Sequence, residues 1–268
     1  MIENDRAQAT RAAFDAAAAD YAERFERSDD HQHIILPSML RLAGDVAGRA
    51  VLCLGYGAGG ELELLRDAGA HRLVGVDLSP EMQRLADARV PEAHVVAGDL
   101  MTFDPRDERF DLVWAALSLQ YVDDLAGALE RCAGWLHPGG RLLLTLPHPI
   151  YFGASRLDHP GGRGQRRVLG YNVWRTDVVD SDQIECFGDY LTIREAPQRL
   201  AKSVDVTFWL RPVSEVVTAV LASPLTLVAL EEPKPRAPQD GDPAALRRFL
   251  VGMRSVPLTI AVAAELPR

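Results

Sequence analysis

The sequence predicts an α/β fold in which a doubly wound sheet is built from strands that alternate with helices. The first strand is a short apolar run that begins at Val51 and enters a glycine-rich turn, and helix-prone residues 61–67 follow it. Apolar runs of strand length recur at residues 73–77, 94–100 and 110–117. This serial pattern favours a parallel sheet. At 268 residues and 47% hydrophobic content, the chain is large enough to bury one sizeable core.

The glycine-rich turn predicts a site for a ligand of the nucleotide type. Gly55, Gly57 and Gly59 carry no side chains that would keep a ligand from the backbone, and the following helix directs unpaired N–H groups toward it. Asp77 ends the second apolar run, where a carboxylate can accept both hydroxyls of a ribose. Because Gly55-x-Gly57-x-x-Gly60 also satisfies the dinucleotide fingerprint, the turn alone leaves a nicotinamide cofactor open.

The strands that follow the glycine-rich turn distinguish a nicotinamide cofactor from another ligand of the nucleotide type. A third run ends in Asp99 and Leu100, and residues 110–117 form a fourth strand. Over residues 50–149 the chain resembles class I S-adenosylmethionine (SAM)-dependent methyltransferases. The resemblance implies that the glycine turn holds the methionine portion, that the second strand holds the ribose and that the third meets adenine. The cofactor residues so predicted are Tyr21, Gly55, Gly57, Gly59, Asp77, Leu78, Asp99, Leu100 and Ala115.

The resemblance also implies the architecture: a Rossmann-like sheet of seven strands whose last strand runs antiparallel. The chain is then one methyltransferase domain in four parts. Residues 1–48 form an N-terminal helical cap, residues 49–150 the cofactor-binding core, residues 151–211 a substrate lid inserted after strand five, and residues 212–268 the rest of the sheet.

Local patterns predict the remaining elements. Apolar spacing of three or four residues predicts helices over 10–27 and 33–42. The resemblance implies that these two helices cap the site and that an aromatic residue of the first, Tyr21 or Phe14, touches the cofactor. A helix over 125–136 ends at a Pro-Gly-Gly turn, and a fifth strand follows at 141–146. Two more strands are expected at residues 225–230 and 258–264, with a short helix at residues 244–253 between them.

Composition limits the partners. A formal net charge of −9 argues against a protein that binds nucleic-acid backbones, since that requires clustered cations. We find no signal-like N-terminus and no apolar run of membrane length, so we expect a cytoplasmic protein without membrane partners. The cysteines Cys53, Cys132 and Cys186 are scattered, which fits neither a disulfide framework nor a zinc site, and we expect no metal. Either a monomer or a homodimer is compatible with the sequence.

Methyl transfer from a sulfonium depends on alignment more than on acid, base or metal, and a base matters only when the acceptor holds its proton tightly. His148 is the first catalytic candidate because it follows strand five at the ligand-binding edge of the sheet. Gln120 is the second and can orient an acceptor by hydrogen bonding. His31 and His33 lie near the predicted N-terminal helices and can enter the same space. The aromatic residues proposed to line an acceptor pocket are Tyr121, Tyr151, Trp174, Tyr190 and Trp209.

The segments around these residues resemble, more narrowly, bacterial small-molecule methyltransferases of the UbiE/COQ5-like type. That resemblance implies methylation of O, N or C on an aromatic or natural-product intermediate, with S-adenosylhomocysteine (SAH) as product. The chain departs from its relatives at Cys53, where most carry an acid that helps organise the loop around the cofactor's ammonium group. The alternatives are a methyltransferase-fold protein that binds SAM but catalyses a cyclisation or rearrangement, a nicotinamide dehydrogenase, and a non-enzymatic subunit.

Overall fold

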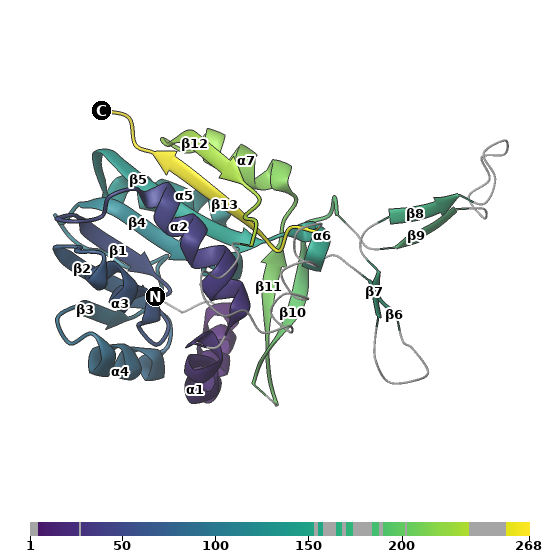
Figure 1. Ribbon diagram of the computed structural model, residues 1–268, viewed down its shortest axis with the longest axis horizontal. Coiled ribbons are helices and arrows are strands. Elements are labelled where there is room, and N and C mark those ends of the chain that lie inside the picture. Colours follow the sequence, from purple (N-terminus) through teal and green to yellow (C-terminus); the bar gives the residue numbers. More distant parts are fainter. Residues whose placement is uncertain are drawn as a thin grey trace.

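The centre of the molecule is a seven-stranded sheet with helices on both faces (Figure 1). The computed structural model describes residues 5–26, 28–152, 155–157, 165–167, 170–173, 184–187, 190–201, 203–235 and 256–268. The strand order is β12-β13-β5-β4-β1-β2-β3, and β13 runs antiparallel to both of its neighbours. The fold predicted from the sequence is therefore confirmed. The strands are β1 (Ala50–Leu54), β2 (Arg72–Asp77), β3 (His94–Ala97), β4 (Phe110–Ala116), β5 (Leu136–Pro147), β12 (Thr226–Glu231) and β13 (Thr259–Glu265).

Each face of the sheet has its own core, because successive side chains of a strand point to opposite faces. On β1, Leu52 and Leu54 pack with helices α5 (Leu125–Trp135) and α7 (Val213–Ala222). Val51 and Cys53 pack on the other face, which is covered by α2 (Leu36–Ala43), α3 (Gly60–Asp67) and α4 (Pro80–Arg89). Strands buried on both faces appear in the sequence as the continuous apolar runs that predicted them.

The N-terminal segment forms α1 (Asp5–Glu26), followed by a π-helical turn, η1 (His31–Ile35), and then α2. The sequence predicted a single helix over 33–42. The α-helix instead begins at Leu36, with Pro37 in its first turn, where a missing N–H has no cost. Helix α1 packs against α4 and against a hairpin of β10 (Arg194–Ala201) and β11 (Val204–Leu210).

This hairpin lies within residues 151–211, the segment that the sequence predicted to be a lid. Its inward residues Leu200 and Val206 pack on Ala17 of α1. The loop after β4, which contains the 3₁₀ turn η2 (Leu119–Tyr121), is bound to it through the Tyr121 hydroxyl, which donates to Gln198 Oε1 at 2.8 Å. Between α6 (Pro149–Phe152) and the hairpin lie two short strand pairs, namely β6 (Ser155–Leu157) with β7 (Gln165–Arg167) and β8 (Gly170–Val173) with β9 (Ile184–Phe187). The predicted helix at 244–253 lies outside the described residues.

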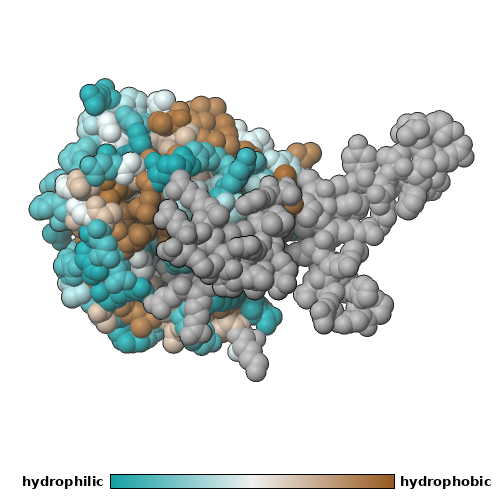
Figure 2. Space-filling model, in the orientation of Figure 1, coloured by the Kyte–Doolittle hydropathy of each residue, from teal (hydrophilic) through white to brown (hydrophobic). Residues whose placement is uncertain are grey.

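The surface seen in this orientation is mainly hydrophilic, with separate hydrophobic patches (Figure 2). Exposed large apolar side chains include Leu191 before the hairpin, Leu221 on α7 and Val228 on β12. Within the described part of the chain, no helix is both long and apolar enough to cross a bilayer.

Candidate functional site

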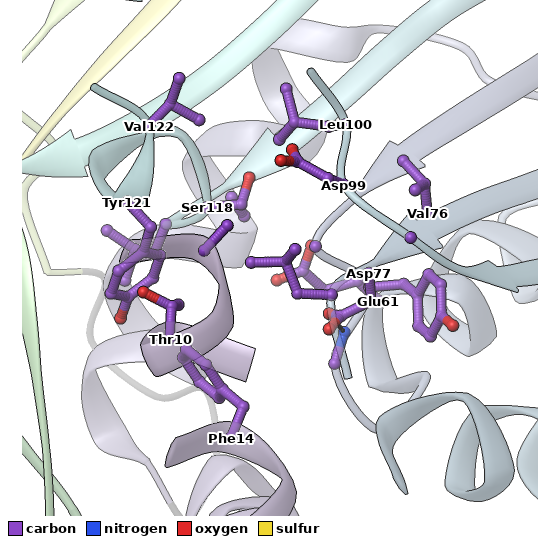
Figure 3. Close-up of a pocket in the computed structure, with 18 of the residues that line it drawn as sticks. Thr10, Phe14, Glu61, Val76, Asp77, Asp99, Leu100, Ser118, Tyr121 and Val122 are labelled. Atoms are coloured by element: carbon purple, nitrogen blue, oxygen red, sulfur yellow. Dashed lines mark hydrogen bonds between the residues drawn. The ribbon is translucent and has the colours of Figure 1, made fainter. Parts of the chain in front are cut away.

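A cavity of about 580 Å³ opens where β1, β2, β3 and β4 end, and α1 closes its other side (Figure 3). Ligands of open α/β sheets bind at this carboxyl edge. Seven of the nine predicted cofactor residues lie on its wall. These seven are Tyr21 from α1 and Gly55, Gly57, Asp77, Leu78, Asp99 and Leu100.

The glycine loop has the conformation that the sequence predicted. Gly55 has a φ of +69°, and a Cβ there would lie 2.5 Å from Ser118 Cβ, so only glycine fits. Gly57 has a φ of +53° and faces the cavity. Gly59 does not line it: a Cβ at this position would lie 3.1 Å from the Cα of Ala86, so this glycine allows α4 to pack closely.

Asp77 is buried at the end of β2 and is held by two backbone donors. Gly57 N donates to Oδ2 at 2.9 Å and Ser79 N donates to Oδ1 at 3.0 Å. Burial raises the pKa of Asp77 and these two hydrogen bonds oppose that shift. Each oxygen keeps a further lone pair, so the carboxylate can still accept the hydroxyls of a ribose.

The loop after β3 forms the adjacent wall. Asp99 Oδ1 accepts a hydrogen bond from Met101 N at 2.8 Å, and this turn presents Leu100 to the cavity. On β4 the prediction is off by one residue. Ala115 is buried in the core against the opposite face, whereas Ala116 lines the cavity, because alternate residues of a strand face opposite ways.

These residues fit SAM. The glycines form a cradle that side chains would fill, and carboxylates stand where a ribose needs acceptors. Ser118 Oγ is buried on the cavity wall without a partner among the described residues, so it can hydrogen-bond a ligand.

A second cavity, of about 530 Å³, adjoins the first. Four residues line both: Tyr21, His31, Leu117 and Tyr121. Gln120 lies in the second cavity and its Nε2 donates to Leu117 O at 2.7 Å, which fixes the amide. Gln120 Oε1 and Thr259 Oγ1, both buried, have no partner within the described structure. The second cavity therefore offers unused hydrogen-bonding groups beside the cofactor site.

His148 lies outside the lining of both cavities. Its side chain is buried, its Nδ1 accepts from Ile150 N at 3.1 Å, and its Nε2 lies 3.1 Å from Glu232 Oε1. Burial lowers the pKa of His148 and the Glu232 hydrogen bond opposes that shift. Although its backbone is at the predicted edge, the geometry does not support a contact between this imidazole and a substrate.

His31 is instead the histidine that the fold brings between the two cavities. Its Nδ1 lies 3.1 Å from Ser28 Oγ. Burial, with a smaller contribution from Arg24, lowers its pKa to about 4, so the imidazole is neutral at pH 7. The sequence analysis expected His31 and His33 near this space, and the path of α1 and η1 brings His31 to it. His33 lines neither cavity.

Of the aromatic residues that the sequence predicted to line an acceptor pocket, some lie on the cavity walls and others do not. Tyr121 lines both cavities, and the Phe14 ring meets it edge-on with centroids 5.3 Å apart. Trp209 lines neither, although its Nε1 donates at 2.7 Å to Oδ1 of Asp123, a residue of the first cavity's wall. Tyr151 and Tyr190 also lie off both walls, and Trp174 is outside the described residues. Among the described residues, no group of three His, Cys, Asp or Glu side chains is arranged to hold a metal.

Comparisons with known proteins agree with this geometry. Residues 52–144 match the family model described as "Methyltransferase domain". Trans-aconitate 2-methyltransferase of Paracidovorax citrulli is 32% identical over 212 residues, which cover 75% of this chain and 77% of that protein. Malonyl-[acyl-carrier protein] O-methyltransferase of Pseudescherichia vulneris is 33% identical over 138 residues, about half of each chain (52% and 53%).

Solved structures show the same fold. A SAM-dependent methyltransferase from Mesorhizobium loti superposes with a TM-score of 0.65 at 23% identity, covering 90% of this chain and 99% of that one. The N-methyltransferase NodS from Bradyrhizobium japonicum, solved with SAH, gives a TM-score of 0.58 at 16% identity, covering 99% of this chain and 100% of that one. The chain belongs to the class I SAM-dependent methyltransferases. It is an enzyme that uses SAM, which removes the nicotinamide dehydrogenase and the non-enzymatic subunit from the hypotheses.

Proposed function

We propose that this enzyme methylates a small molecule that binds in the second cavity and hydrogen-bonds to Gln120 and Thr259. One observation supports this above others. Gln120 Oε1 and Thr259 Oγ1 are buried without partners in the cavity that adjoins the cofactor site. Since an unsatisfied buried polar group costs about 1–3 kcal/mol, a ligand that supplies the missing hydrogen bonds gains affinity there. An amide oxygen accepts, so the molecule presents a hydroxyl or an N–H to Gln120.

The site's own residues align and shield the acceptor. SAM, when bound, supplies an electrophilic methyl group on its sulfonium. Leu117 and Tyr121 lie between the two cavities and fix the direction of approach, while Phe208 adds an apolar wall that excludes water. His31 can accept a proton at this boundary, but its lowered pKa makes it a weak base. The site therefore suits an acceptor that is already nucleophilic, such as an amine, an enolate or an acidic phenol.

The substrate named for the Paracidovorax citrulli relative is trans-aconitate, a tricarboxylate, which suggests a carboxylate acceptor as the second candidate. Arg24 on the wall of the second cavity favours it. The same wall also carries Asp20, Glu23 and Asp30, whose charges would repel a polyanion. We therefore favour a neutral or singly charged acceptor over a tricarboxylate.

We also propose that the insertion at residues 151–211 covers the acceptor. Phe152, Gln198 and Phe208 come from this segment and line the second cavity. Gln198 is fixed by the Tyr121 hydroxyl, so the cover and the loop after β4 are linked by a direct hydrogen bond. The parts of the insertion at residues 158–164 and 174–183 lie outside the described residues.

Formation of SAH tests the proposal. The purified enzyme is incubated with SAM and with matched panels of amines, phenols, enolisable ketones, monocarboxylates and trans-aconitate, and SAH and methylated product are measured by mass spectrometry. We expect turnover with the first three classes. Turnover with trans-aconitate alone would favour the second candidate, and conversion of an acceptor without SAH would indicate a cyclisation or rearrangement.

Variants then test the acceptor site. Thr259→Val removes only the hydroxyl, and we expect the KM of the acceptor to rise about tenfold, the equivalent of one lost hydrogen bond, with unchanged SAH affinity. Thr226→Val, at an exposed position of β12, is the control. An unchanged KM in Thr259→Val would contradict the proposed binding mode.

A further inference from the structure

Glu61 is a buried carboxylate on the wall of the cofactor cavity. It lies in the first turn of α3 with 5% of its surface exposed. Its Oε2 accepts a hydrogen bond of 2.5 Å from the indole Nε1 of Trp114. Among the described residues, Trp114 is the one hydrogen-bond donor to this side chain, so Oε1 remains available at the cavity. Figure 3 shows Glu61 beside Asp77, across the cavity from Tyr121 and Thr10.

Among the described residues, none is identified as supplying a cation to this carboxylate. Burial raises the pKa of Glu61 to about 8, and only the Trp114 hydrogen bond opposes that shift. The titratable groups around it are Tyr21 on α1, Cys53 on β1 and Asp77 at the end of β2, none of which is cationic. Arg24 acts on Tyr21 but does not contribute to the pKa of Glu61. A buried carboxylate without a counter-charge is costly, so the site favours a cationic ligand group.

The surroundings of Glu61 connect it to the altered position 53. Cys53 and Trp114 are register partners on adjacent parallel strands, and both pack in the core on the α3 side of the sheet. Burial raises the pKa of the Cys53 thiol and Glu61 adds to that shift, so the Glu61 carboxyl lies near the Cys53 side chain. A carboxylate projecting from α3 therefore reaches the neighbourhood of Cys53, the position on β1 at which the resemblance implies an acid.

We propose that Glu61 binds the ammonium group of the cofactor's methionine portion, in place of the acid that position 53 lacks. The ribose acceptor Asp77 and the adenine-side residues after β3 occupy one part of the cavity, which leaves the glycine loop, Tyr21 and Glu61 for the methionine portion. The inference rests on the cofactor half of the proposed function and is independent of the acceptor. Binding converts a protonated Glu61 into a carboxylate, and the proton is released to solvent.

Calorimetry with two ligands tests this role. SAH carries the ammonium group, whereas 5′-methylthioadenosine retains the adenosine and sulfur but lacks the amino-acid portion. Glu61→Gln preserves an oxygen that can accept from Trp114, and Glu130→Gln, at an exposed position of α5, is the control. We expect Glu61→Gln to weaken SAH binding roughly 10- to 100-fold, as for loss of a hydrogen bond to a charged group, and to change 5′-methylthioadenosine binding by less than about twofold.

Proton release provides a second measurement. At pH 7, SAH binding to the wild type in buffers of different ionisation enthalpy should release close to one proton from Glu61, and binding to Glu61→Gln should release none. Cys53→Asp in the Glu61→Gln background should restore part of the SAH affinity. Equal losses for both ligands in Glu61→Gln, or unchanged SAH affinity, would overturn the role of Glu61. A wild type that binds 5′-methylthioadenosine and SAH equally would also overturn it, and one that binds neither would overturn the cofactor site itself.

Discussion

The carboxylate of Asp77 accepts a hydrogen bond of 2.9 Å from the backbone N–H of Gly57, so the residue predicted to hold the ribose also holds the glycine loop. Its other oxygen fixes Ser79 N, the start of the turn into α4. Ser79 then accepts from Met82 N at 3.1 Å as the N-cap of that helix. One carboxylate thus connects the predicted ribose site with the conformation of two loops.

Replacement of Asp77 by alanine should weaken SAH binding by roughly 1–3 kcal/mol, since ribose acceptors and the Gly57 hydrogen bond are lost together. Asp77→Asn keeps one acceptor oxygen and should fall between alanine and wild type. Asp67→Ala, at an exposed position of α3, serves as the control. Calorimetry that gives equal SAH affinity for wild type and Asp77→Ala would contradict the assignment of the ribose site.

Gly55→Ala should weaken both folding and cofactor binding. The added Cβ would lie 2.5 Å from Ser118 Cβ, and the alanine would have to adopt a left-handed backbone conformation. The close contact or the backbone conformation alone costs about 1–2 kcal/mol of stability. Gly134→Ala, near the end of α5 with open space around it, should leave SAH binding unchanged and stabilise the protein by about 0.5–1 kcal/mol. Urea denaturation and calorimetry measure both effects. Similar results for the two variants would mean that the glycine loop tolerates a side chain.

Prediction from the sequence worked where the signal is local. The buried strands are continuous apolar runs, Asp77 is the last residue of β2 and Asp99 lies two residues beyond β3, so chain order was sufficient to place them at one edge. The acceptor cavity combines Gln120 with Thr259, residues brought together by pairing of distant segments that no local pattern encodes. For His148 the strand end fixed the backbone position, but the direction of the side chain depends on Glu232, which follows β12.

His148 should therefore contribute to stability more than to turnover. His148→Ala removes the contacts with Ile150 N and Glu232, and we expect the free energy of unfolding to fall by about 1–3 kcal/mol. Because burial lowers the pKa of His148 below 6.5, its contribution is complete above pH 6.5 and is lost as pH falls through the lower folded-state pKa. Urea titrations between pH 5 and 7.5 should show a shallower pH dependence in the variant. A kcat lowered 10²-fold or more without loss of stability would reinstate His148 as the base.

The free enzyme should also become less stable as Glu61 is forced to ionise. Its folded-state pKa of about 8 lies above the ordinary glutamate pKa of 4.5, so the stability it contributes is fully present below pH 4.5 and is lost as pH rises through 8. Glu61→Gln cannot ionise, so its stability relative to wild type should increase with pH by up to roughly 1.4 kcal/mol per unit and level off above pH 8. Thermal unfolding of both proteins from pH 5.5 to 9 measures this difference, which saturating SAH should reduce because its ammonium pairs with the ionised carboxylate. A difference that stays constant across this pH range would show that Glu61 is already ionised in the free enzyme.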